Sequence, residues 1–265
     1  MRKLLNSLYI TDETVWLALD GENIVCKGEE GEKFCMPFVN IEEIFCFSYL
    51  GCSPALMGKC ADLGIALNFI SPQGEFLARI QGKTRGNILL RKAQFEQFAD
   101  PPILLAQKDD FYLIKRTKRP PLDKVNAMLS YLYTIMTSSY TSALESVGLD
   151  SCYGYYHALR SGRSSLACDL VEETRAVIER LVLTLINLKK VNAKDFEVQE
   201  SGAVFLTRDG KKKVLTAWQE KRRSTILHPF LKEKIPFGLL PYVQSSLLAK
   251  YIRGELTEYP CFLQK

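Results

Sequence analysis

The chain has 265 residues and a net charge of +5, a length that suits one large domain or two modest ones. Its residues are 47% hydrophobic and 25% charged, an ordinary globular mixture that excludes a disordered or fibrous protein. The apolar runs are too short to span a bilayer and the first residues lack the features of a secretion signal, so we expect a cytoplasmic protein with no membrane contact.

Residues 1–80 show the short apolar runs and tight turns that are typical of β-hairpins. Asp20-Gly21 is one such turn. Ser53 and Pro54 form a helix start, and Gly64 forms the matching helix stop. The predicted strands cover residues 15–19, 24–27, 33–39, 44–49, 65–70 and 76–80.

From about residue 85 the apolar spacing becomes helical. Asp123 can cap a long helix that runs to Val147 and stops at Gly148. Further helices are predicted over residues 85–98, 165–188, 211–223 and 239–253. The fold class is therefore α+β, with a small N-terminal β domain at residues 1–80 and a larger, all-helical C-terminal domain at residues 81–265.

Eight cysteines are present, and no two of them form a C-x-x-C pair. This spacing disfavours a structural zinc site, and a disulfide framework is unexpected in a cytoplasmic protein of this size. Most of the cysteines stand in apolar stretches, where we expect them to act as small hydrophobic residues.

The chain has only two histidines, His157 and His228. His157 lies in a short link before the helix predicted at residues 165–188, and Asp169 and Glu172 lie on one face of that helix, three positions apart. One imidazole and two carboxylates suit Mg²⁺ or Mn²⁺. The spacing also fits a structural histidine and acidic residues that favour a helix start, so both interpretations stay open.

The positive charge is concentrated in the second part of the chain. Residues 1–80 hold 6 Lys and Arg against 11 Asp and Glu, whereas residues 81–265 hold 29 against 19. Basic clusters at residues 115–119, 211–213 and 221–223 favour a groove that binds a polyanion. The aromatic residues stand mostly at core-like spacing, which does not indicate base stacking. No P-loop, nucleophile elbow or Rossmann fingerprint is present, which disfavours a nucleotide-driven motor or an α/β-hydrolase.

Several motifs in series resemble one family, the CRISPR-associated endonuclease and spacer integrase known as CRISPR-associated protein 1. The similar segments are residues 19–23 (LDGEN), 53–57 (SPALM), 82–91 (GKTRGNILLR), 118–127 (KRPPLDKVNA), 143–150 (ALESVGLD), 154–157 (GYYH) and 165–172 (SLACDLVE). The tail at residues 238–244 (GLLPYVQ) resembles the subtype I-C branch of the family.

The resemblance implies an N-terminal β domain that forms a homodimer and a C-terminal helical domain that carries Mg²⁺ or Mn²⁺. It further implies a partner, the small second CRISPR adaptation protein, and an insertion reaction in which the 3′-hydroxyl of a DNA fragment attacks a phosphodiester of the CRISPR repeat. The family's metal ligands and catalytic residues carry over to His157 and Glu172, with Asp169 as a supporting residue or an alternate ligand. Double-stranded DNA, as prespacer and as repeat, would contact Arg163, Arg175, Lys115, Arg116, Lys118, Arg119, Lys221, Arg222 and Arg223.

One family feature is missing. Members carry a further metal glutamate in a G-[IVL]-E-G-x-x-A motif between the segments that match residues 82–91 and 118–127, and this chain has no such motif there. Either the segment has been lost from the protein, or the sequence is given without it; the clean resumption of the pattern on both sides favours the second. A true loss would favour another function, a catalytically impaired DNA-binding subunit of the same complex.

Overall fold

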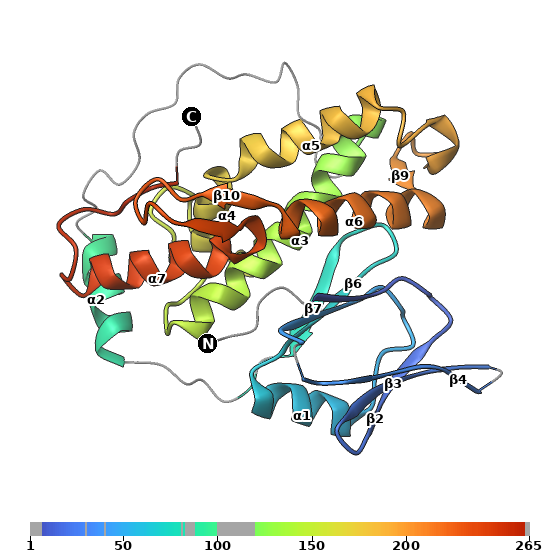
Figure 1. Ribbon diagram of the computed structural model, residues 1–265, viewed down its shortest axis with the longest axis horizontal. Helices are drawn as coiled ribbons and strands as arrows, with labels where there is room; N and C mark the ends of the chain where they lie inside the picture. The colour runs from blue at the N-terminus through green and yellow to red at the C-terminus, as the bar shows by residue number, and fades with distance from the viewer. Residues whose placement is uncertain are drawn as a thin grey trace. The chain divides into compact units, whose positions relative to one another are not determined.

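The computed structural model describes residues 7–29, 31–39, 41–80, 82, 88–99 and 120–262. The chain divides into two compact units, Met1–Thr84 and Arg85–Lys265. We call them the N-terminal and the C-terminal unit (Figure 1).

The N-terminal unit contains two sheets and one helix. A three-stranded antiparallel sheet has the order β2-β3-β4, and a four-stranded sheet has the order β1-β5-β6-β7, in which only β6 and β7 are antiparallel neighbours. The bounds are β1 Ser7–Ile10, β2 Trp16–Asp20, β3 Asn23–Gly28, β4 Gly31–Pro37, β5 Glu43–Cys46, α1 Pro54–Leu63, β6 Ala66–Ile70 and β7 Phe76–Ile80. The predicted strands and helix are confirmed; β1 was not predicted, because four residues that pair only with distant β5 give no local signal.

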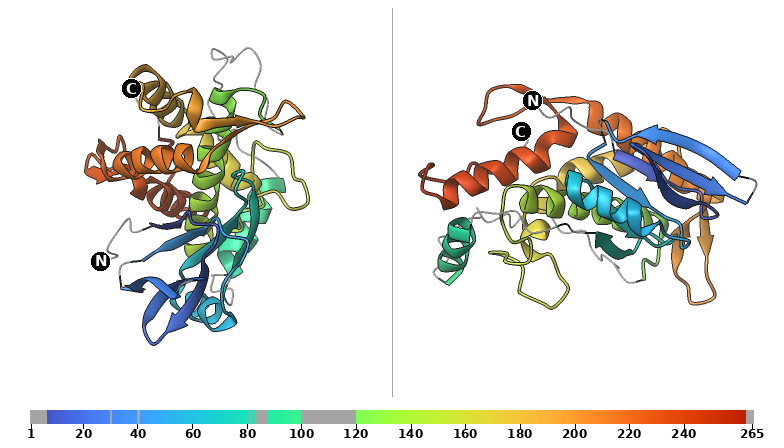
Figure 2. Two further views of the ribbon diagram at one scale, coloured as in Figure 1. Left: turned by 90° about the vertical axis from the view of Figure 1, so that its right-hand side faces the viewer. Right: turned by 90° about the horizontal axis from the view of Figure 1, so that it is seen from below.

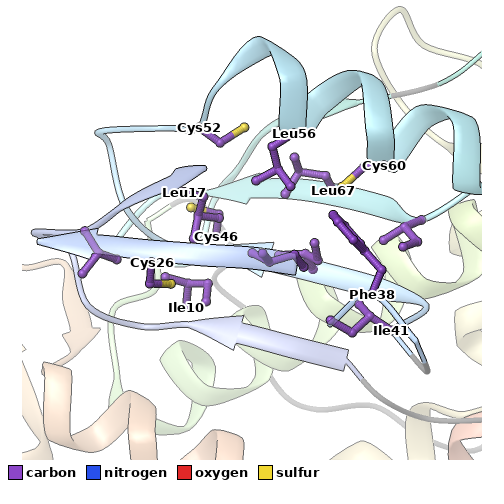
Figure 3. Close-up of a cluster of buried hydrophobic side chains, with 14 residues drawn as sticks. Ile10, Leu17, Cys26, Phe38, Ile41, Cys46, Cys52, Leu56, Cys60 and Leu67 are labelled. Atoms are coloured by element: carbon purple, nitrogen blue, oxygen red, sulfur yellow. The ribbon is translucent and has the colours of Figure 1, made fainter. Parts of the chain in front are cut away.

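The helix ends follow from local chemistry. The Ser53 hydroxyl accepts a hydrogen bond from the N–H of Leu56 (3.2 Å), and Gly64 ends α1 in the left-handed conformation at a φ of 70°. The core beneath α1 is drawn in Figure 3, where Leu56 and Cys60 of α1 lie beside Leu67 of β6.

Four cysteines belong to the buried residues of the N-terminal unit, namely Cys26, Cys46, Cys52 and Cys60. Burial raises the pKa of Cys26 and Cys52 to about 11 and that of Cys60 to about 12. Thiols with such pKa values stay protonated at neutral pH, so these cysteines pack as small hydrophobic residues.

The C-terminal unit is built around the long helix α3 (Lys124–Ser146), which packs against α4 (Ser165–Glu172), α5 (Arg175–Asn187) and α7 (Leu240–Ile252). Figures 1 and 2 show α3 in green among these helices. Asp123 caps α3 by accepting a hydrogen bond from the N–H of Asn126 (2.8 Å). The remaining helices are α2 (Ile88–Ala99) and α6 (Arg208–Arg223). No helix in the described ranges has the length and hydropathy that a bilayer crossing requires.

Two features of the C-terminal unit differ from the prediction. It is mostly but not wholly helical, because two antiparallel strand pairs link its helices: β8 (Phe196–Val198) with β9 (Val204–Leu206), and β10 (Thr225–Leu227) with β11 (Lys234–Pro236). Short 3₁₀ turns cover Ala193–Asp195 and Phe237–Leu239. The α+β class nevertheless holds.

The helix predicted over residues 165–188 is broken after Glu172. Thr174 is fully buried, and its hydroxyl donates to the carbonyl oxygen of Val171 (2.9 Å), so the chain turns before α5 begins at Arg175. The apolar spacing continues across the break, which explains why the sequence predicted one helix.

Candidate metal and DNA-binding site

The carboxylate of Asp169 holds the loop that leads to α4. Asp169 is 5% exposed. Its Oδ2 accepts hydrogen bonds from the backbone N–H groups of Tyr155 (2.6 Å) and Tyr156 (3.1 Å), and its Oδ1 accepts one from the N–H of His157 (2.9 Å). Hydrogen bonds from three consecutive N–H groups to one carboxylate fix the loop backbone against the helix.

A glycine allows the loop to approach α4 this closely. A Cβ atom on Gly154 would lie 2.6 Å from Oδ2 of Asp169 and 2.7 Å from the carbonyl carbon of Ser165. Non-bonded atoms do not pack at such distances, so a larger residue would push the loop off the helix. The GYYH motif thus begins with the residue that close packing requires.

The same carboxylate orients the imidazole of His157. Nδ1 of His157 lies 2.7 Å from Oδ1 of Asp169, and 19% of the histidine side chain is exposed. Because an ionised carboxylate only accepts hydrogen bonds, we assign the ring proton to Nδ1, which leaves a lone pair on Nε2. Histidine ligands of metals are oriented by carboxylates in this way. Both oxygens of Asp169 are engaged within the protein, which favours the supporting role over that of an alternate ligand.

Glu172 lies one turn beyond Asp169 on α4, with 40% of its side chain exposed. Its Oε2 is 2.9 Å from a terminal nitrogen of Arg175, whose Nε is 2.9 Å from Oε1 of Glu179. The guanidinium also lies 6.0 Å from the ring centroid of Tyr133. Arg175, predicted to face DNA, is therefore held between two carboxylates, and its charge is partly neutralised within the protein.

Within the described ranges, no three or more His, Cys, Asp and Glu side chains are placed to share a metal ion. Nε2 of His157 and the half-exposed carboxylate of Glu172 are nevertheless suitable donors, since Mg²⁺ is commonly held by one or two carboxylates together with water and substrate phosphates. His157 and Glu172 therefore suit a divalent cation that takes its remaining ligands from water, from substrate phosphates or from other residues.

The predicted DNA-binding residues have different surroundings. Lys115, Arg116, Lys118 and Arg119 lie outside the described residues. Arg163 is half-buried, at the end of an exposed loop that follows His157. Lys221 and Arg223 stand in the last turn of α6, where burial lowers the pKa of Lys221 and the charge of Arg180 on α5 lowers it further. Arg222 is only 6% exposed, so the structure does not support it as a surface contact for DNA.

Tyr156 was missed because sequence patterns did not distinguish it from core aromatic residues. It is 70% exposed, whereas the hydroxyl oxygen of the preceding Tyr155 is buried. The ring of Tyr156 meets that of His157 edge to face, with centroids 5.5 Å apart and an interplanar angle of 90°. An exposed aromatic ring therefore stands directly beside the candidate metal ligand.

A second polar cluster surrounds Glu173, the residue that follows Glu172. The carboxylate of Glu173 accepts hydrogen bonds from Nε2 of Gln244 (2.6 Å), the hydroxyl of Tyr259 (2.7 Å) and the N–H of Phe262 (2.9 Å). His228 is fully buried: its Nδ1 accepts from the N–H of Leu231 (3.2 Å), so its Nε2 donates to Oε1 of Gln244 (2.9 Å). The second histidine of the chain is therefore structural.

Comparison with known proteins places these motifs in one family. The model of the family described as CRISPR associated protein Cas1 matches residues 8–108 and 103–220. The CRISPR-associated endonuclease Cas1 1 of Chlorobaculum tepidum is 35% identical over 341 aligned positions, which cover 99% of each chain. The CRISPR-associated endonuclease Cas1 2 of Rhodospirillum rubrum is 35% identical over 344 positions, which cover all of both chains.

These alignments are several dozen positions longer than the chain itself. The two stretches that match the family model overlap at residues 103–108. This junction lies in the interval where the sequence lacks the glutamate motif.

Solved structures show the same fold. A CAS1 protein from Thermotoga maritima superposes with a TM-score of 0.81 at 18% identity, covering 96% of this chain and 99% of that one. A casposase bound to an integration product also gives a TM-score of 0.81, at 16% identity, covering 97% of this chain and 93% of the casposase.

Proposed function

Because the chain belongs to the Cas1 family of CRISPR-associated proteins, we propose that it is a metal-dependent DNA endonuclease and integrase that inserts new spacers into the CRISPR array. The observation that carries the proposal is the oriented pair of His157 and Asp169, with the accessible carboxylate of Glu172 one turn beyond Asp169 on α4. The 3′-hydroxyl of the incoming DNA attacks a phosphodiester of the repeat, and the 3′-hydroxyl of the cleaved strand leaves.

The residues of this chain have distinct tasks in that reaction. Nε2 of His157 and the carboxylate of Glu172 would hold Mg²⁺ or Mn²⁺, and Asp169 would keep the imidazole in the tautomer that binds a cation. When bound, the cation supplies positive charge to the attacked phosphate and to the oxygen nucleophile. Arg163, Lys221 and Arg223 would bind the DNA backbone without reading its sequence.

The family also supports the partners that we propose, namely double-stranded DNA, a second copy of the chain bound through the N-terminal unit, and the small second adaptation protein. A solved complex named Cas6-RT-Cas1–Cas2 contains a chain whose fold matches this one with a TM-score of 0.75, covering 98% of this chain and 36% of that one, at 14% identity. We place the protein in the cytoplasm.

Strand transfer into a plasmid that carries the repeat tests the proposal. We expect the wild-type protein, with its adaptation partner and Mn²⁺, to join a DNA fragment to the plasmid. His157→Ala should lower the rate at least about a hundredfold while the affinity for DNA changes less than about twofold, because the imidazole serves the metal and not the backbone contacts. Ser161→Ala, in the exposed loop nearby, is the control. Integration by His157→Ala at the wild-type rate would refute the mechanism.

The missing glutamate motif favours a second candidate, a DNA-binding subunit with an impaired metal site. The intact mass of the protein from its native source distinguishes the two. A mass several kilodaltons above the 30.1 kDa of this sequence would show that the segment exists and would support the integrase. A mass of 30.1 kDa, together with DNA binding but no strand transfer by the wild type, would establish the impaired subunit.

Arg175→Gln should raise the affinity for Mn²⁺. The Arg175 guanidinium lies 2.9 Å from the Glu172 carboxylate. A divalent cation that binds Glu172 must therefore either displace the guanidinium or share the carboxylate with it. A single positive charge repels a divalent ion about 6 Å away by about 1 kcal/mol in water, so we expect a gain of roughly fivefold to tenfold. Titration calorimetry checks this, with Arg180→Gln as the control, because Arg180 is exposed on the same helix. An affinity no higher than that of the wild type would contradict the competition.

A further inference from the structure

Gln94 on α2 is a polar side chain that is fully buried. Its Oε1 accepts a hydrogen bond from the N–H of Asp150 (2.9 Å), and its Nε2 donates to the carbonyl oxygens of Asp150 (2.8 Å) and Tyr153 (3.2 Å). One side chain thus pairs with both backbone groups of Asp150, as a neighbouring strand would. Arg91, one turn earlier on the same face of α2, donates through Nε to the carbonyl oxygen of Gly148 (3.4 Å).

This stretch of backbone opens the loop that carries His157. The carbonyl oxygen of Ser151 accepts a hydrogen bond from the N–H of Leu166 at the start of α4 (2.9 Å). Further along the loop, Asp169 accepts hydrogen bonds from the N–H groups of residues 155–157. The loop is therefore tied to α2 where it begins and to α4 where His157 stands.

The hydrogen bonds require an amide at position 94. The N–H of Asp150 needs an acceptor and the two carbonyl oxygens need a donor, which an amide supplies together and an ionised carboxylate does not. A glutamate of the same size would place negative charge against two carbonyl oxygens. A methionine of similar length would leave all three backbone groups without these partners.

The loop has little room in which to absorb a shift of its first residues. Gly154 already packs so closely on α4 that a Cβ atom would lie 2.6 Å from Oδ2 of Asp169. Close-packed parts transmit a displacement to their neighbours. A movement at Asp150 and Tyr153 should therefore reach the N–H groups that Asp169 holds, and with them the imidazole.

We propose that Gln94 is a positioning residue for His157: it fixes the start of the loop and thereby sets where Nε2 of the imidazole meets a cation. This inference rests on the proposed function for the role of the cation. Gln94 itself touches neither metal nor DNA in this account. It acts through the backbone of residues 150–153.

Gln94→Glu tests the inference, and Gln94→Met is the uncharged second variant in case Gln94→Glu does not fold. Both should bind Mn²⁺ about 3- to 10-fold more weakly in titration calorimetry, a smaller loss than for Asp169→Asn, because Gln94 acts one contact further from the metal. Hydrogen exchange at residues 155–157 should become at least about tenfold faster. In strand transfer the half-saturating Mn²⁺ concentration should rise by the same factor, with the rate at saturating Mn²⁺ within about twofold of the wild type.

Two control variants separate positioning from general stability. Leu215→Ala removes a buried side chain of α6 and should lower the melting temperature while leaving the Mn²⁺ affinity unchanged. Gln199→Glu makes the same chemical change as Gln94→Glu at an exposed glutamine of the C-terminal unit. It should leave the Mn²⁺ affinity, the melting temperature and the exchange rates as they are in the wild type.

The outcomes distinguish the positioning role from the proposed chemistry. If both Gln94 variants are destabilised but keep the wild-type Mn²⁺ affinity and the protection of residues 155–157, Gln94 is structural only and the inference is wrong. If the wild type binds Mn²⁺ but transfers no strand, while the variants still loosen the loop and bind Mn²⁺ more weakly, the chemistry fails and the positioning role stands. A wild type that binds no Mn²⁺ would overturn both.

Discussion

Asp169→Asn is expected to lower the affinity for Mn²⁺ about 10- to 100-fold, although the new side chain has the same size. An amide group can donate as well as accept. If its NH₂ group faces His157, Nδ1 of the imidazole becomes the acceptor and Nε2 takes the proton, so Nε2 loses the lone pair with which it would bind a cation. If the NH₂ group faces the N–H groups of Tyr155 and Tyr156 instead, it offers them no acceptor.

The same substitution should destabilise the C-terminal unit by about 2–3 kcal/mol, because buried donors lose a charged acceptor. Asp169→Ala removes every acceptor and should cost about 3–5 kcal/mol. Urea unfolding measures the stability and titration calorimetry measures the Mn²⁺ affinity. Asp209→Asn, an exposed acid in the first turn of α6, serves as the matched control. Asp169→Asn with wild-type affinity for Mn²⁺ would show that the carboxylate does not set the tautomer.

The parts of the fold that the sequence predicted depend on chemistry within a few residues. Ser53 and Asp123 each accept a hydrogen bond from the N–H three positions ahead, so a short motif contains the whole interaction. The pairing of His157 with Asp169 is of the same kind, since only twelve positions separate them. A loop that short has few ways to close onto its helix.

The parts that were not predicted depend on distant partners or on helix rotation. The break between α4 and α5 is held by contacts of Glu173 with residues 86 and 89 positions away, and no window of sequence reveals them. Arg222 stands between two other basic residues, yet it shares a face of α6 with Trp218, four positions before it, and both are buried. Composition predicts a positive cluster, but the rotation of the helix decides which of its members meet solvent.

Glu173→Leu should lower the free energy of unfolding by about 3 kcal/mol or more. Three donors converge on this carboxylate, from Gln244, Tyr259 and Phe262, and Gln244 is fully buried. A leucine fills similar volume but removes the acceptor of the Tyr259 hydroxyl and of the Phe262 N–H, and each buried donor without a partner costs about 1–3 kcal/mol. The Gln244 amide keeps its hydrogen bonds to the Tyr259 hydroxyl oxygen (2.8 Å) and the Pro260 carbonyl oxygen (3.3 Å). Glu173→Gln keeps one acceptor oxygen, so its free energy of unfolding should lie between those of the wild type and Glu173→Leu.

Glu172→Gln is a demanding control for that experiment, because it changes the adjacent residue in the same chemical way. Glu172 is 40% exposed and pairs with a half-exposed arginine, so its loss should cost no more than about 1 kcal/mol. Hydrogen exchange should show the segment at residues 259–262 opening in Glu173→Leu and staying protected in Glu172→Gln, since Glu173 ties that segment to the end of α4. Equal protection in the two variants would mean that other contacts hold the segment. Loss of protection in Glu173→Leu alone would mean that Glu173 holds residues 259–262 against the end of α4. This distant segment would then help to fix the helix end that carries Glu172.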